Sequence, residues 1–173
     1  MVVGGSYRDD AVVVGRERET AHLLAAVGVG PDATAATVIV HGEAGIGKTA
    51  LVADCVEALR VSNPDAVICH GACLPLVSLT VPFIGIRSAL HRSPRAVIGS
   101  DLGPPAPDLD ASPARVPVLL DRWVDDITRS RRLVIVIDDL QWADRDTLDA
   151  LLYLVAGPAE RALTLIGTVL DSD

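Results

Sequence analysis

Residues 42–49 read Gly-Glu-Ala-Gly-Ile-Gly-Lys-Thr and match the pattern G-x-x-x-x-G-K-[ST], which strongly constrains the fold. An apolar run rich in β-branched residues, 37–41, precedes this segment. A run with apolar residues at helical spacing, 50–60, follows it. A strand, a glycine-rich loop and a helix in this order are what the pattern requires. The sequence therefore predicts a phosphate-binding loop that ends at the start of a helix.

The residues of this loop have separate predicted roles. Gly42, Gly45 and Gly47 let the backbone curl so that successive N–H groups form an anion nest at the helix N-terminus. Lys48 is the only lysine of the chain, and its compact ammonium fits between the β- and γ-phosphates of a nucleotide. Thr49 offers a hydroxyl to Mg²⁺. The predicted nucleotide-binding residues of the loop are Gly42, Glu43, Ala44, Gly45, Ile46, Gly47, Lys48 and Thr49.

A second informative segment is the apolar run 133–137, which two carboxylates follow directly. Five consecutive apolar residues, mostly β-branched, predict a strand that is buried on both faces. We expect Asp138 to hold Mg²⁺ together with Thr49, because this ion keeps several waters and needs few protein ligands. Asp139 is the candidate to orient or deprotonate an attacking water, although its side chain is shorter than that of Glu. The alternative is that these carboxylates only cap a turn or a helix.

Strands alternate with helices along the chain, which predicts an α/β domain. The sheet should be mainly parallel with right-handed crossovers, as in a three-layer P-loop NTPase fold. Ligands bind beyond the carboxyl ends of such strands, where the phosphate-binding loop and Asp138 both fall. The other predicted elements are helices 17–27, 82–91, 116–129 and 147–156, strands 66–71 and 163–169, and a proline-rich loop 93–113.

Composition excludes some classes of function. The formal net charge of −8 leaves no basic stripe, which argues against direct nucleic-acid binding by this segment. No apolar stretch reaches the roughly 18 residues of a membrane span. Three cysteines without framework spacing favour a reducing, cytoplasmic compartment. Cys69, His70 and Cys73, with His41, fit no four-ligand zinc pattern, so we interpret the cysteines as small buried apolar residues.

Three stretches of this sequence resemble the ATPase module of STAND-type AAA-like proteins, and in particular the large ATP-binding regulators of the LuxR family. They are Val-Gly-Arg-Glu at 14–17, the loop 42–49, and Val-Ile-Asp-Asp-Leu-Gln-Trp-Ala-Asp at 136–144. Residues 82–90 also resemble the family's segment after its second strand. The resemblance implies ATP and ADP as ligands and Mg²⁺ as the metal. It also implies that Val14 and Gly15 lie near the adenine and that Arg16 reaches the nucleotide or anchors the first helix.

The same resemblance suggests that Gln141, Trp142 and Asp144 couple the nucleotide state to neighbouring elements, although we favour a packing role for Trp142. One departure is Leu170, which stands where the family pattern has an arginine that would sense the γ-phosphate. We expect a flexible tail at 1–12 and a P-loop ATPase domain at 13–173 that is C-terminally incomplete, without the family's last strand and winged-helix part. Contacts with C-terminal domains or self-association would then be its protein partners, because an unfinished sheet edge invites pairing.

These observations predict a Mg-ATP-binding switch domain of a signalling or transcriptional regulator, with slow or no hydrolysis. One alternative is an ATPase that turns over steadily and drives a partner. Another is an interaction module that is degenerate or truncated and does not hydrolyse ATP. A third is the ATPase module of a regulator that is fused to a nucleotide cyclase or a kinase.

Overall fold

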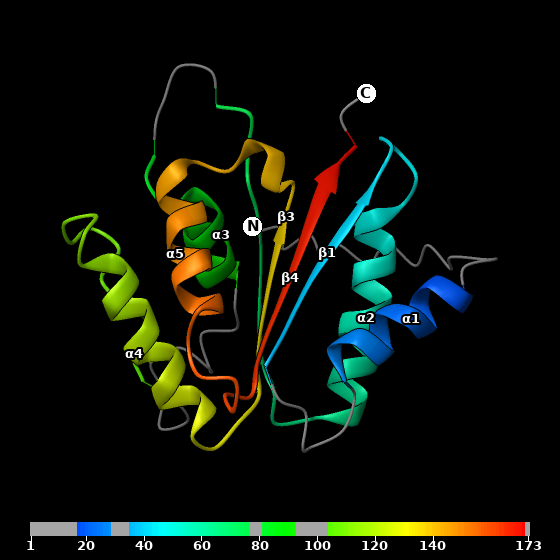
Figure 1. The fold of residues 1–173 in the computed structure, drawn as a ribbon, viewed down its shortest axis with the longest axis horizontal. Helices are drawn as coiled ribbons and strands as arrows, with labels where there is room; N and C mark the ends of the chain where they lie inside the picture. Colours follow the sequence, from blue (N-terminus) through cyan, green and yellow to red (C-terminus); the bar gives the residue numbers. More distant parts are fainter. Residues whose placement is uncertain (1–16, 29–34, 77–80, 93–103, 172–173) are drawn as a thin grey trace, which may run out of the picture.

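The computed structural model describes residues 17–28, 35–76, 81–92 and 104–171, which form one parallel sheet between two layers of helices (Figure 1). The strand order is β1-β4-β3-β2, and every neighbouring pair is parallel. The sheet is therefore the one that alternating strands and helices predict, and the predicted α/β P-loop fold class is confirmed. The strands are β1 (Ala36–Gly42), β2 (Val67–Ala72), β3 (Leu133–Asp138) and β4 (Leu163–Leu170).

Helices cover the two faces of the sheet unequally. Among the described elements, α1 (Glu17–Val27) and α2 (Lys48–Ser62) lie on one face and α3 (Ile84–Arg92), α4 (Val116–Thr128) and α5 (Arg145–Val155) on the other, an arrangement that can be followed in Figure 1. A short 3₁₀ helix, η1 (Leu140–Trp142), follows β3. No helix in the described residues combines the length and hydrophobicity that crossing a membrane would need.

Strand β3 organises the core, because all six of its residues are buried. Val134 and Val136 face α1 and α2, whereas Ile135 and Ile137 face the three-helix layer. Side chains of a strand alternate between the two faces of a sheet, so this one strand supplies apolar surface to both cores. The prediction of a strand buried on both faces is confirmed.

The buried guanidinium of Arg132 anchors α1 to the sheet. It donates hydrogen bonds to the carbonyl oxygens of Val27 and Gly28, which end α1, and to Oγ1 of Thr164 on β4 at 2.8 Å. The last carbonyls of a helix have no partner within the helix, so a side-chain donor there satisfies groups that would otherwise be buried without one. This residue was not singled out from the sequence.

Strand β1 lies at one edge of the sheet, and its outward side chains on the α5 side are exposed. Ile39 is 50% exposed. Together with Leu148, Leu152 and Val155 of α5 it lines an apolar groove of about 320 Å³. The three-helix layer thus leaves the β1 side of this face open.

Replacing Leu59 with Ala should destabilise the fold by about 2–5 kcal/mol, because Leu59 is fully buried between α2 and the sheet and its loss leaves a cavity. Urea denaturation followed by circular dichroism measures this change. Leu152→Ala is the matched control, since that leucine is 65% exposed. Its effect should stay within about 0.5 kcal/mol. Equal losses in the two variants would contradict the described packing of α2.

Candidate functional site

The loop between β1 and α2 lies at the carboxyl edge of the sheet and has the backbone that an anion nest requires. Gly45 and Gly47 have φ values of 74° and 90°. Residues with a side chain rarely adopt this left-handed region, so glycine is needed at both places. Gly42 ends β1 without a positive φ. Of the three glycines singled out in the sequence, two therefore make the curl of the loop.

Lys48 is the first residue of α2, and its side chain folds back over the loop. The ammonium Nζ donates hydrogen bonds to the carbonyl oxygens of Gly42, at 2.7 Å, and Glu43, at 2.8 Å. The residue is only 9% exposed, so the loop itself holds the charge in place. Thr49 is exposed in the first turn of the same helix. Lys48 and Thr49 are thus adjacent to the loop, as their predicted roles require.

Asp138 ends β3 at the same edge of the sheet and is 6% exposed. Its two carboxylate oxygens accept hydrogen bonds from two different strands. Thr168 Oγ1, on β4, lies 3.1 Å from Oδ1, and His70 Nε2, on β2, lies 2.8 Å from Oδ2. The carboxylate is therefore fixed from both sides by neighbours that the sequence analysis did not assign to it.

Asp139 has a left-handed backbone, with φ of 59°, at the turn from β3 into η1. Its N–H donates to Thr168 Oγ1 at 2.9 Å, and its Oδ1 accepts from Gln141 Nε2 at 3.0 Å. Gln141 Oε1 in turn accepts from the N–H of Leu170 at 3.2 Å. The side chain of Asp139 makes no capping hydrogen bond to η1. It is instead part of a chain of contacts that reaches the end of β4.

Asp144 caps two helices at once. Its carboxylate accepts from the N–H and the hydroxyl of Thr147 at the start of α5, and from the N–H groups of Phe83 and Ile84 at the start of α3. Burial raises the pKa of this carboxyl group, but the hydrogen bonds from Thr147, Phe83 and Ile84 outweigh that effect. The net pKa lies below its ordinary value. Asp144 therefore joins α3 to α5 as a charged carboxylate.

The oxygen donors at this edge suit Mg²⁺. Within the described ranges no group of three or more His, Cys, Asp and Glu side chains could hold a metal by itself. Mg²⁺ needs no such group, because one or two protein oxygens, waters and phosphate oxygens complete its shell. The hydroxyl of Thr49 and the carboxylate of Asp138 are ligands of the right kind. The donor set therefore fits the metal that the sequence predicts.

The cysteines, Cys69 and Cys73 among them, are buried. Burial, and then the charges of Asp144, Asp139 and Asp138, raise the pKa of Cys73 to about 11. A thiol with such a pKa stays protonated at neutral pH and is a poor ligand or nucleophile. The interpretation of the cysteines as buried apolar residues agrees with this environment.

The structure does not describe some of the residues singled out in the sequence, and it contradicts the role that we favoured for another. Val14, Gly15 and Arg16 lie outside the described residues. Trp142 is 49% exposed, so the packing role that we favoured for it is wrong. It belongs to η1, whose residues are not buried.

The sequence analysis missed His70 and Thr168. Both lie near the carboxyl ends of predicted strands that flank Asp138. That position in the predicted sheet was the signal that could have identified them.

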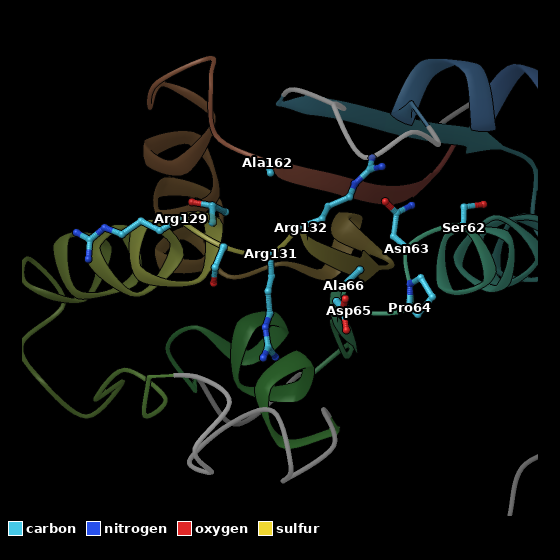
Figure 2. Close-up of a pocket in the computed structure, with 11 residues that line it drawn as sticks. Ser62, Asn63, Pro64, Asp65, Ala66, Arg129, Arg131, Arg132 and Ala162 are labelled. Atoms are coloured by element: carbon cyan, nitrogen blue, oxygen red, sulfur yellow. The ribbon is translucent and has the colours of Figure 1, made fainter.

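A second hollow, of about 430 Å³, lies at the opposite edge of the sheet, where β2, β3 and β4 begin (Figure 2). Three arginines line it, but Figure 2 shows their side chains pointing in different directions. Arg129 forms an ion pair with Asp126, and Arg132 donates hydrogen bonds to the carbonyl oxygens at the end of α1. Two of the three arginines thus have partners within the fold, and the three side chains do not converge on one point, so we place the candidate site at the carboxyl edge.

Comparison with known proteins agrees with this geometry. The model of the AAA ATPase domain family matches residues 12–166. The chain belongs to this family. The family is one of ATP-binding domains, and Mg²⁺ generally accompanies the nucleotide in them.

A solved structure has a similar fold. It is the crystal structure of Cdc6p from Pyrobaculum aerophilum, with a TM-score of 0.62 and 16% sequence identity. The match covers 96% of this chain and 42% of that chain, so this chain spans less than half of the length of that protein. At this identity the likeness shows the fold alone. No curated protein sequence matches the chain.

Replacing Asp144 with Ala should lower the free energy of unfolding by about 1–3 kcal/mol at pH 7, because buried N–H groups of two helices lose their acceptor. The native pKa is depressed, so the contribution is fully present above the unfolded pKa of about 3.9 and is lost as the pH falls through the native pKa. The difference between wild type and variant should therefore shrink at low pH. Urea denaturation at pH 7 and pH 3 measures this difference in the free energy of unfolding. The exposed Asp149→Ala is the control. A difference that increases at pH 3 would contradict the role of Asp144 as a charged cap.

Proposed function

We propose that this chain is a Mg-ATP-binding switch domain with slow hydrolysis. The observation that carries the proposal is the convergence of two motifs on one edge of the sheet. The loop at 42–49 and the strand end at Asp138 are far apart in the sequence, yet β1 and β3 are both parallel to β4, which lies between them. Both therefore end at the edge where ligands of such sheets bind. Membership of the AAA ATPase domain family supports ATP as the ligand.

The proposed roles follow from the chemistry of each group. N–H groups of residues 43–48 would bind the phosphates, and Lys48 would move its ammonium from the loop carbonyls to the β- and γ-phosphate oxygens. Thr49 and Asp138 would hold Mg²⁺, which when bound would neutralise phosphate charge. Asp139 would place the attacking water, with Gln141 restraining its carboxylate. We further propose that Val14, Gly15 and Arg16 contact the adenine side of the nucleotide.

The broader proposal is a regulator of the STAND type, related to the LuxR-family ATP-binding regulators. Its support is the stretch 138–144, whose side chains connect the candidate site to peripheral elements. Gln141 links Asp139 to the end of β4, and Asp144 links α3 to α5. A ligand shifts a conformational equilibrium only through different affinities for the two states. The contacts of Gln141 join the site to the end of β4, and the same short segment ends at the residue that caps two helices, which gives such a difference a structural route.

The first test is binding of Mg-ATP to the 173-residue chain by calorimetry. We expect a dissociation constant near the micromolar range and at least a hundredfold weaker binding for Lys48→Ala, which removes the charge that the loop holds for the phosphates. Arg60→Ala is the control, since it removes a cation at the far end of the same helix. No binding by a folded wild-type chain would overturn the proposed function.

The second test is phosphate release with Mg-ATP in excess. We expect slow release, because Leu170 offers an apolar side chain at the end of β4, where the family's pattern has an arginine. Asp139→Asn should lower the rate by about a hundredfold or more, in the range typical for loss of a general base, with little change in Mg-ATP affinity. Asp126→Asn, an exposed carboxylate on α4, serves as the control. An Asp139→Asn variant that releases phosphate at the wild-type rate would remove Asp139 from the chemistry.

A further inference from the structure

His70 makes the shortest polar contact to the carboxylate of Asp138. Its Nε2 lies 2.8 Å from Oδ2, and the two side chains are 33% and 9% exposed. An ionised carboxylate only accepts hydrogen bonds, so Nε2 carries the hydrogen in this contact. The residue belongs to none of the sequence motifs that predict nucleotide binding.

The register of the sheet brings these two residues together. In the pairing of β2 with β3, His70 is opposite Val136 and Asp138 is opposite Ala72. The two residues are therefore diagonal neighbours on one face of the sheet, which is within reach of a side chain as long as histidine. That face is the one that α1 and α2 cover, because Ile68, Val134 and Val136 point the same way. Helix α2, which starts at Lys48, therefore packs on the same face of the sheet as His70 and Asp138.

The carboxylate can keep this contact and still bind a cation. Within the part of the chain that the structure describes, each oxygen accepts one hydrogen bond, from His70 or from Thr168. A carboxylate has about four acceptor positions, so each oxygen has capacity for one further partner. Groups that hold a ligating carboxylate in place from outside the metal shell raise metal affinity, because they fix its orientation before the metal arrives.

We propose that His70 is a positioning residue that fixes the Asp138 carboxylate for the divalent cation of bound Mg-ATP. The inference rests on the proposed function, and it adds a residue from β2 to a site otherwise built from the phosphate-binding loop, β3 and β4. In this proposal His70 acts through the Asp138 carboxylate and makes no contact of its own with the nucleotide. It should therefore affect the affinity for the metal and leave the affinity for metal-free nucleotide unchanged.

The test uses the 173-residue chain with Mn²⁺ in place of Mg²⁺ and a non-hydrolysable ATP analogue. Electron paramagnetic resonance measures free Mn²⁺ during titration of the protein–nucleotide complex, and calorimetry in EDTA measures binding of the metal-free nucleotide. His70→Phe keeps a ring and loses the N–H, whereas His70→Gln keeps an N–H donor. His91→Phe, at an exposed position in the last turn of α3, is the matched control.

We expect His70→Phe to weaken Mn²⁺ binding by about tenfold or more, the usual effect of losing an outer partner of a metal ligand. His70→Gln should recover most of that loss, and the affinity for metal-free nucleotide should stay within about twofold in all variants. If His70→Phe does not fold, as judged by circular dichroism, His70→Ala takes its place.

Two results would overturn the inference while leaving the proposed function intact. One is unchanged or tighter Mn²⁺ binding by folded His70→Phe, which would make His70 a bystander or a competitor of the metal. The other is equal weakening with and without metal, which would indicate a general disturbance of the site. If the wild-type chain bound the analogue neither with nor without metal, the proposed function itself would fail and this inference with it.

Discussion

Strand β3 is the constraint on which the fold and the candidate site both depend. It hydrogen-bonds to β2 on one side and β4 on the other, and it is buried on both faces. Two separate apolar cores meet on its alternating side chains. A strand in this position cannot shift by one residue without sending its apolar side chains to the wrong faces. Its carboxyl end is therefore fixed in space, and Asp138 with it.

The phosphate-binding side of the site depends on a different kind of restraint. Lys48 is nearly buried, and the carbonyl oxygens of Gly42 and Glu43 hold its ammonium. A cation held by neutral carbonyl groups keeps its charge available for an anion, and no carboxylate among the described residues forms an ion pair with Lys48. Asp138 is restrained by hydrogen bonds to His70 and Thr168. The opposite charges of the site thus lie on separate elements, Lys48 at the start of α2 and Asp138 at the end of β3.

Much of this could be predicted from the sequence because local patterns specify it. The glycine spacing at 42–49 and the apolar run at 133–137 fix a strand, a loop and a helix without reference to the rest of the chain. What could not be predicted arises from the pairing of distant strands. His70 reaches Asp138 only through the β2–β3 register, and the double cap by Asp144 exists only because the starts of α3 and α5 lie together. The exposure of Trp142 likewise depends on what packs over η1.

The two strands whose side chains hold Asp138 differ in the number of neighbouring strands that pair with them. Thr168 lies on β4, which is flanked on both sides, whereas His70 lies on β2, which has one strand neighbour in the described sheet. Edge strands separate from a sheet at lower free-energy cost than central ones. Fraying of β2 would release the oxygen that His70 holds, while Thr168 on the central strand β4 still holds the other. The Asp138 carboxylate would then be free to turn on one side without any opening of the strands that flank β4.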